Sequence, residues 1–117
     1  MTYETSRALK LVQVRIPVSL YARIVRQSQS SGRSMEDLYQ DAVRALLQAY
    51  SEKKNAFIFR ASYKGQKAYN LNVRLPGNLY ELVEKATRKA EVSKTSLVYT
   101  ALYEAFDTPK KGGETNA

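Results

Sequence analysis

The tetrapeptide Val14-Arg15-Ile16-Pro17 returns as Val73-Arg74-Leu75-Pro76, and this repeat indicates how the chain is organised. The offset is 59 positions, and it holds without a gap through the residues that follow. Identical residues then recur at Leu20-Tyr21 and Leu79-Tyr80, Ser34 and Ser93, Leu38 and Leu97, and Ala42 and Ala101. Repetition at one offset indicates a structural unit that is used twice. We therefore interpret the chain as two copies of a unit of roughly 40 residues, at 10–50 and 69–107, each too small to bury much core alone.

Each copy opens with a predicted β-strand. Apolar and polar side chains alternate over residues 10–16 and again over residues 69–75. This period of two is typical of a strand with one buried face, and Pro17 and Pro76 end the two strands. An isolated strand of this length is unstable, so we expect 10–16 to pair antiparallel with 69–75. The polar face of that ribbon would carry Leu11, Gln13, Arg15, Asn70, Asn72 and Arg74.

After each proline the apolar period becomes helical, which predicts two helices in each copy. Ser19 and Asn78 are the expected caps of the first helix in each copy. Gly32 is expected to end the first helix in a left-handed conformation. Glu91 stands at the equivalent position of the second copy, where a left-handed backbone is unfavourable. That turn should therefore either differ in shape or be mildly strained.

The second helix of each copy begins after a serine. Ser34 is expected to cap one, with Asp37 at the spacing of a capping box, and Ser93 is expected to cap the other.

The segment 51–68 joins the two copies. Ala56–Tyr63 contains Phe57-Ile58-Phe59 and is too apolar for an inert linker, so we expect it to lie extended against the domain. Lys64-Gly65-Gln66-Lys67 is typical of a turn. Residues 1–9 are expected to form a flexible arm, and residues 108–117 a disordered tail.

Composition excludes several classes of function. The chain has 117 residues and no Cys or His, so it lacks disulfides, thiolate or imidazole metal sites, and the Ser-His-Asp and Cys-His nucleophile pairs. We expect no catalytic residue, no metal site and no cofactor. No apolar run approaches the length of a membrane span, and the first residues lack the layout of a signal peptide. The expected location is cytoplasmic, away from the membrane.

The positive charge is distributed unevenly along the chain. The net charge is +8, of which residues 7–50 and 51–68 each contribute +4, whereas residues 69–109 are neutral. One interpretation is an ordinary solvated surface. The other, which we favour, is an electrostatic footprint for nucleic-acid phosphates.

The nine tyrosines raise the alternative of a DNA-nicking nucleophile. Most of them fall on or beside the apolar stripes of the predicted helices, so core packing explains them better. A nicking enzyme also requires a metal or a cluster of acid–base groups, which the sequence does not offer. We therefore do not expect an enzyme.

The order strand, Arg-x-Pro, helix, Gly-Arg-Ser turn, helix resembles the ribbon–helix–helix DNA-binding family of the Arc and MetJ repressor kind. In that family two chains intertwine and insert an antiparallel ribbon into the major groove. The resemblance covers residues 10–50 and 69–107. It implies a mainly α-helical fold in which two fused units form an intramolecular pseudo-dimer, with a two-stranded ribbon on four helices. A fused pair is similar to the longer TraY proteins of conjugative plasmids.

The resemblance also implies which residues contact DNA. Base contacts would come from the six side chains of the polar ribbon face, and phosphate contacts from the amino ends of the second helices, at Arg33, Ser34 and Met35 and at Val92, Ser93 and Lys94. Amides and Arg are the side chains that pair with adenine and guanine edges. A helix amino end favours an anion through its free amides and its dipole. Leu11 departs from this pattern; it is either an apolar residue on the solvent face or a contact to a thymine methyl.

Together these features predict a sequence-specific protein that binds double-stranded DNA. The resemblance implies an accessory factor at a plasmid transfer origin, with a relaxase or other transfer proteins as partners and with regulation of its own operon as an additional role. The alternatives are a plasmid or phage transcriptional repressor, an antitoxin, which the short tail after Asp107 disfavours, and an RNA-binding module, for which no motif is found. We expect a monomer in solution, with several monomers lining up on longer DNA.

Overall fold

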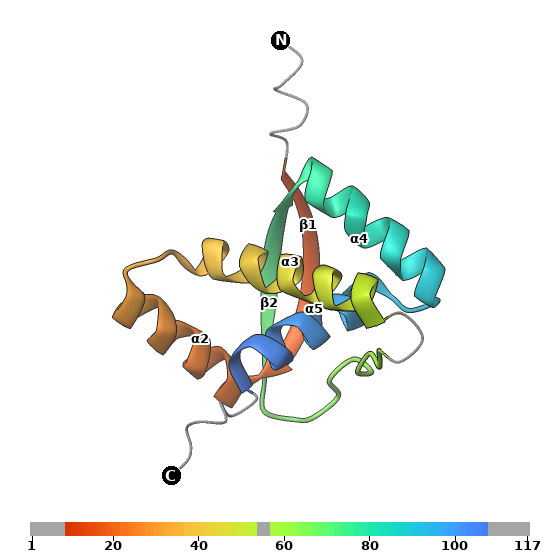
Figure 1. Cartoon of the computed structure of the whole chain (residues 1–117). Helices are drawn as coiled ribbons and strands as arrows, with labels where there is room; N and C mark the ends of the chain where they lie inside the picture. The colour runs from red at the N-terminus through yellow and green to blue at the C-terminus, as the bar shows by residue number, and fades with distance from the viewer. Residues whose placement is uncertain (1–8, 54–56, 108–117) are drawn as a thin grey trace.

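The computed structural model describes residues 9–53 and 57–107 (Figure 1). Apart from Leu9, the expected arm at 1–9 and the expected tail at 108–117 lie outside these residues. The described chain is mainly helical and contains one two-stranded antiparallel sheet, as the sequence predicted. Its elements are β1 (Leu9–Pro17), α2 (Val18–Ser31), α3 (Met35–Lys53), β2 (Ala68–Pro76), α4 (Gly77–Ala90), α5 (Lys94–Leu102) and the π-helical turn η2 (Tyr103–Asp107).

Strands β1 and β2 pair antiparallel along their whole length. Leu9 lies opposite Pro76, and Pro17 lies opposite Ala68. Each strand is one residue longer at both ends than the predicted 10–16 and 69–75. Because side chains alternate across a strand, the extra residue at the start of β1 adds Leu9 to the outward face.

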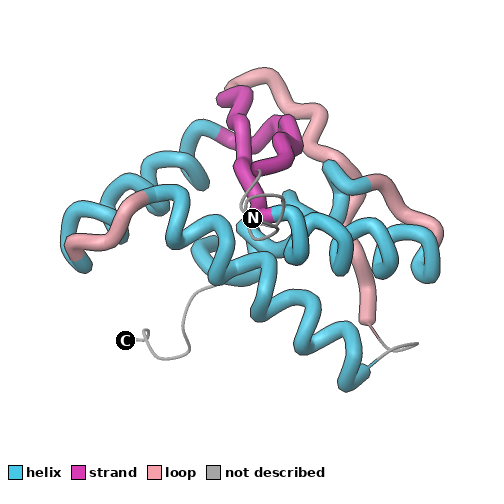
Figure 2. Tube along the Cα trace, turned by 90° about the horizontal axis from the view of Figure 1, so that it is seen from above, coloured by secondary structure: helices cyan, strands magenta, loops and turns pink. Residues whose placement is uncertain are grey.

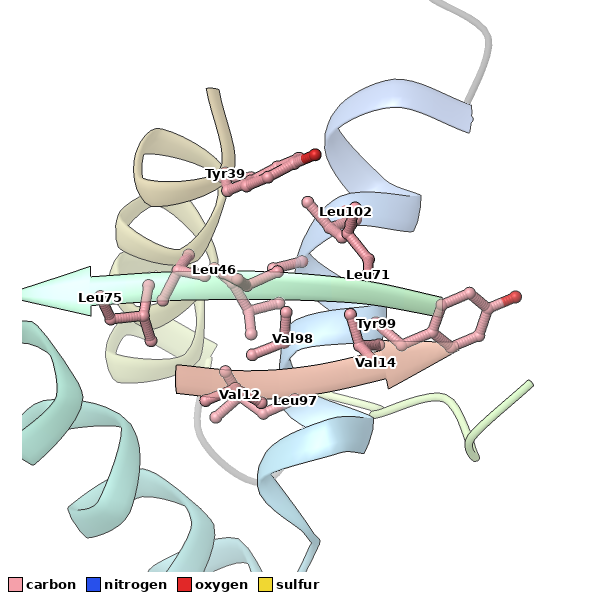
Figure 3. Close-up of a cluster of buried hydrophobic side chains, with 14 of the residues drawn as sticks. Val12, Val14, Tyr39, Leu46, Leu71, Leu75, Leu97, Val98, Tyr99 and Leu102 are labelled. Carbon is pink, nitrogen blue, oxygen red and sulfur yellow. The ribbon is translucent and has the colours of Figure 1, made fainter. Parts of the chain in front are cut away.

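The inward face of the ribbon forms one wall of a single core. Val12, Val14 and Ile16 of β1 are buried, as are Leu71, Val73 and Leu75 of β2. Helix α5 packs against β1, and α3 packs against β2 and against α5. Figure 3 shows apolar side chains of α3 and α5 closing over this face: Tyr39, Leu46, Leu97, Val98, Tyr99 and Leu102. Burying an aliphatic side chain contributes roughly 1.5–3 kcal/mol, so the packing of these helices on the ribbon stabilises the fold.

All the helices lie on one side of the ribbon. Figure 2 shows the two strands at one edge of the molecule, with the helices spread beneath them. Within residues 9–53 and 57–107, no helix therefore covers the outward face of the ribbon.

The amino ends of α2 and α4 differ from the prediction. The helices begin at Val18 and Gly77, immediately after Pro17 and Pro76, which are themselves the N-cap residues and make no side-chain cap bond. Proline suits this position because its fixed φ fits both the extended strand and the helix that follows. Ser19 was thus wrongly predicted as a cap, and it lies inside the first turn. Asn78 was wrong in the same way, although its Oδ1 accepts a hydrogen bond of 2.9 Å from the amide of the next residue.

The turns after α2 and α4 share a left-handed shape. Gly32 has φ 75° and Glu91 has φ 60° and ψ 46°. The prediction for Gly32 is confirmed. The sequence left open whether the turn at Glu91 has a different shape or the same shape with strain. The structure has the same left-handed shape, which costs a residue with a Cβ about 1–2 kcal/mol.

The segment between α3 and β2 packs on the domain but forms no strand. Helix α3 continues to Lys53, three residues into the predicted linker. Residues 57–67 have no regular secondary structure; Phe57, Phe59 and Tyr63 pack against the core. Ala56, the first residue of the predicted extended segment, lies outside the described residues. The expected turn appears as a bend at Gln66 and Lys67.

Candidate nucleic-acid interface

The six predicted ribbon residues lie together on the outward face of β1 and β2. Their side chains are all exposed. Across the two strands they form three opposed pairs, which are Leu11 with Arg74, Gln13 with Asn72, and Arg15 with Asn70. Side chains opposed in this way are close enough to act on one target, with Cβ atoms roughly 4.5–5.5 Å apart.

The two ends of this face carry the same cation but different neighbours. Arg15 stands opposite Asn70 at one end, and Arg74 stands opposite Leu11 at the other. Leu9 adds to the apolar character of the second end, because it is 50 % exposed and Leu11 is 51 % exposed. One end is therefore fully polar, whereas the other combines a guanidinium with two half-exposed leucines.

Helix side chains that the sequence analysis missed hold the ribbon backbone. The Thr95 hydroxyl donates a hydrogen bond of 3.0 Å to the carbonyl of Gln13. Gln40 Nε2 donates one of 3.1 Å to the carbonyl of Arg74. Both bonds fix a strand residue whose side chain points outward. Thr and Gln at these positions are compatible with any helix, so the sequence carried no signal for either contact.

A hollow opens beside the polar end of the ribbon. Its volume is about 360 Å³, and Gln13, Val14, Arg15, Asn70 and Thr95 line it. It lies between the ribbon face and the amino end of α5. Hydrogen-bonding groups from both strands and one helix therefore surround a space that is large enough for part of a polar ligand.

The amino ends of α3 and α5 are capped as the sequence predicted. Ser34 Oγ accepts a hydrogen bond of 3.0 Å from the amide of Asp37, and Ser93 Oγ accepts one of 3.0 Å from the amide of Ser96. The first amides of a helix have no partner within the helix. In both helices, free backbone amides of this kind lie in the first turn after the capping serine. That turn contains Met35 in α3 and Lys94 in α5.

The two cations predicted to contact phosphates are paired with carboxylates of the chain itself. Arg33 Nη2 lies 2.6 Å from Asp41 Oδ2, and Lys94 Nζ lies 3.7 Å from Glu84 Oε2. Lys94 also lies 5.5 Å from the centre of the Tyr80 ring. Exposed ion pairs contribute only about 0–1 kcal/mol, so a phosphate can compete for either cation. The sequence analysis did not anticipate these carboxylates. Val92, which precedes the cap of α5, donates its amide to Thr87 O at 3.1 Å.

Arg15 makes a contact that the sequence analysis also missed. Its Nη2 donates a hydrogen bond of 2.9 Å to the carbonyl of Gly65, in the loop that leads into β2. Among the described residues, the side chain of Arg74 has no such bond. The two arginines of the ribbon are therefore held differently.

Three tyrosines lie in surroundings that keep their hydroxyls protonated. Burial, with smaller effects from Tyr21 and Tyr69, raises the pKa of Tyr39 to about 12. A side-chain hydrogen bond with Tyr69, together with burial, raises the pKa of Tyr21, and burial raises the pKa of Tyr99. A tyrosine nucleophile is activated by the opposite shift. These tyrosines pack against the core, as the sequence indicated.

A further hollow lies between α3 and α4. Its volume is about 720 Å³, and its walls include Leu47, Leu79 and Leu82. Exposed cations, among them Lys85 and Lys89, stand on its rim. None of the predicted DNA-contacting residues lines it.

No helix within 9–53 and 57–107 carries an apolar stretch that could cross a bilayer. Comparison of the chain with protein-family models, with curated proteins and with solved structures finds no match.

Proposed function

We propose that the chain is a tandem ribbon–helix–helix protein that binds double-stranded DNA sequence-specifically. The observation that carries the proposal is the uncovered ribbon face, on which six side chains, mostly amides and guanidiniums, stand in three cross-strand pairs. A two-stranded ribbon fits the major groove, where each base pair presents a distinct set of donors and acceptors. In this proposal the two halves form a pseudo-dimer, because each half supplies one strand of the ribbon.

The helix amino ends would then position the ribbon. Two capped ends, each beside a cation, lie on the helices that pack directly under β1 and β2. Phosphates on either side of a major groove would meet these amides, which the helix dipole makes favourable for anions. Binding would exchange the weak pairs of Arg33 with Asp41 and of Lys94 with Glu84 for phosphate contacts.

We further propose a biological role as an accessory factor at a plasmid transfer origin. The two ends of the ribbon differ, with Asn70 beside Arg15 but Leu11 beside Arg74. A protein with unlike halves can mark a direction along DNA, and a strand-specific nick requires a direction. A plain repressor of a plasmid or phage operon remains the second candidate. Finding a relaxase or transfer gene beside the coding gene would favour the first role over the second.

Selection of bound duplexes from a random library, followed by affinity measurements at several salt concentrations, tests the proposal. We expect a defined consensus and an affinity that falls steeply with salt, because several phosphate counterions are released. A protein that enriches no sequence, or that binds single-stranded RNA better than duplex DNA, would refute the proposed function.

A further inference from the structure

The loop between α3 and β2 is held at several points from Phe57 to Lys67, although it has no regular secondary structure. Phe57 and Phe59 pack with Tyr50, at ring-centroid distances of 6.0 and 5.4 Å. The amide of Arg60 donates a hydrogen bond of 2.8 Å to Thr100 Oγ1, and its guanidinium lies 3.5 Å from the centre of the Tyr103 ring. Ordering these residues costs conformational entropy, which a linker that only joins the two halves would not lose.

The end of the loop is fixed against the polar end of the ribbon. The Gly65 carbonyl accepts the bond from Arg15, and the Lys67 carbonyl accepts a bond of 3.1 Å from the amide of Val18. The Tyr63 ring packs on the core and lies so close over Gly65 that a Cβ there would collide with its hydroxyl end. The backbone from Tyr63 to Lys67 is therefore held by the core on one side and by the ribbon on the other.

This arrangement holds two lysines beside the ribbon. Lys64 follows the packed Tyr63, Lys67 carries the bonded carbonyl, and both side chains are exposed. No acidic residue occurs between residues 57 and 67. Figure 2 shows the loop rising past the helices and reaching the strands on the side that faces away from them. The loop backbone that carries Lys64 and Lys67 therefore borders the ribbon at the end where Arg15 lies.

We propose that Lys64 and Lys67 contact phosphates of DNA that flanks the ribbon at its Arg15 end, and that the Gly65 carbonyl orients Arg15 for its base. This inference rests on the proposed function. The chain supplies the loop only where β1 ends and β2 begins, so these contacts extend the bound site on one side. The loop acts as a third DNA-contacting element besides the ribbon and the helix amino ends.

The test compares two double variants, Lys64→Ala/Lys67→Ala and Lys85→Ala/Lys89→Ala. The second pair removes the same charge from exposed positions at the α3–α4 hollow, which no predicted DNA-contacting residue lines. The probe is a mixed-sequence duplex, titrated by fluorescence anisotropy between about 50 and 200 mM salt. Losing two phosphate contacts should lower the log–log salt slope by about 1.8, so the affinity lost over that salt range becomes roughly tenfold smaller. The control pair should leave the slope unchanged.

Hydroxyl-radical footprinting on the selected consensus duplex shows where along the DNA the loop makes its contacts. The loop variant should lose protection at one end of the footprint only, at the end that Arg15→Ala also affects. Equal slopes for the loop variant and wild type, or loss of protection at both ends, would overturn this inference while leaving the proposed function intact. Failure of the wild type to bind duplex DNA would instead refute the proposed function. Circular dichroism of each variant checks that the fold is retained.

Discussion

The rings of Tyr21 and Tyr69 stack face to face, with centroids 3.9 Å apart and planes inclined by 15°. Tyr21 belongs to α2 and Tyr69 to β2, so the stack joins the two halves of the chain. Tyr69 is 41 % exposed, which leaves part of the pair at the surface. The stack closes the end of the ribbon at which Arg15 meets the loop.

A double-mutant cycle measures this stack. Tyr21→Ala and Tyr69→Ala should together destabilise the fold by less than the sum of their separate effects. The coupling free energy expected for a stacked aromatic pair is about 0.5–1.5 kcal/mol. Urea unfolding of the four proteins gives it directly. Additive effects would show that the stack contributes only through the apolar area each ring buries.

Alkaline pH should destabilise the protein partly through Tyr39. The pKa of Tyr39 is about 12 in the folded chain, whereas the ordinary pKa of a tyrosine is 10.0. Between these two pH values the folded state keeps the hydroxyl proton that the unfolded state has released. The contribution of this protonated hydroxyl to the free energy of unfolding is constant below pH 10 and falls as the pH rises from 10 toward 12. Tyr39→Phe should therefore lose less stability than wild type between about pH 8 and pH 11 in urea unfolding. An identical loss in both proteins would contradict the expectation.

The turn residues Gly32 and Glu91 form a matched pair. Glu91→Gly should raise the free energy of unfolding by about 0.5–1 kcal/mol, because the relief of left-handed strain exceeds the entropy cost of glycine. Gly32→Ala should lower it by about 1 kcal/mol. No atom stands within 4 Å of the added Cβ at Gly32, so only the backbone conformation is tested there. Thermal or urea unfolding shows whether Glu91→Gly raises and Gly32→Ala lowers the free energy of unfolding.

The DNA consensus should not be a palindrome. A homodimer presents identical side chains to both half-sites, whereas here Arg15 has Asn70 opposite it and Arg74 has Leu11. Each arginine should favour a guanine, and Arg15→Ala or Arg74→Ala should cost about 1–3 kcal/mol and relax the preference in one half-site only. Selection with each variant measures this. A symmetric consensus, or one that neither substitution alters, would exclude the ribbon as the base-contacting element.

Off DNA the protein should be a monomer of 13.3 kDa. Both strands of the ribbon come from one chain, so no second chain is needed to complete it. Light scattering on dilute protein checks the mass. A strict dimer would indicate that the ribbons pair between chains in solution.

Local sequence patterns were enough to predict the two strands, the face that each leaves exposed, and the caps at Ser34 and Ser93. These features depend on residues two to four positions apart, where period and residue type set the conformation. The pairing of the strands joins opposite halves of the chain and was inferred because a lone strand of this length is unstable. The sequence did not locate the starts of α2 and α4. From the sequence, each proline could be the first residue of the helix or the residue just before it. In the structure each proline ends its strand, so the helix begins at the next residue.

The contacts that support the candidate site come from long-range packing. Arg15 bonds to Gly65 across 50 positions, and Thr95 bonds to Gln13 across 82. Such partners meet because the helices and the loop pack on the ribbon, and neither residue type nor local spacing records that packing. A polar side chain on a helix or in a turn has many possible partners at the sequence level. Burial of the shared core between β1, β2, α3 and α5 is what selects one of them.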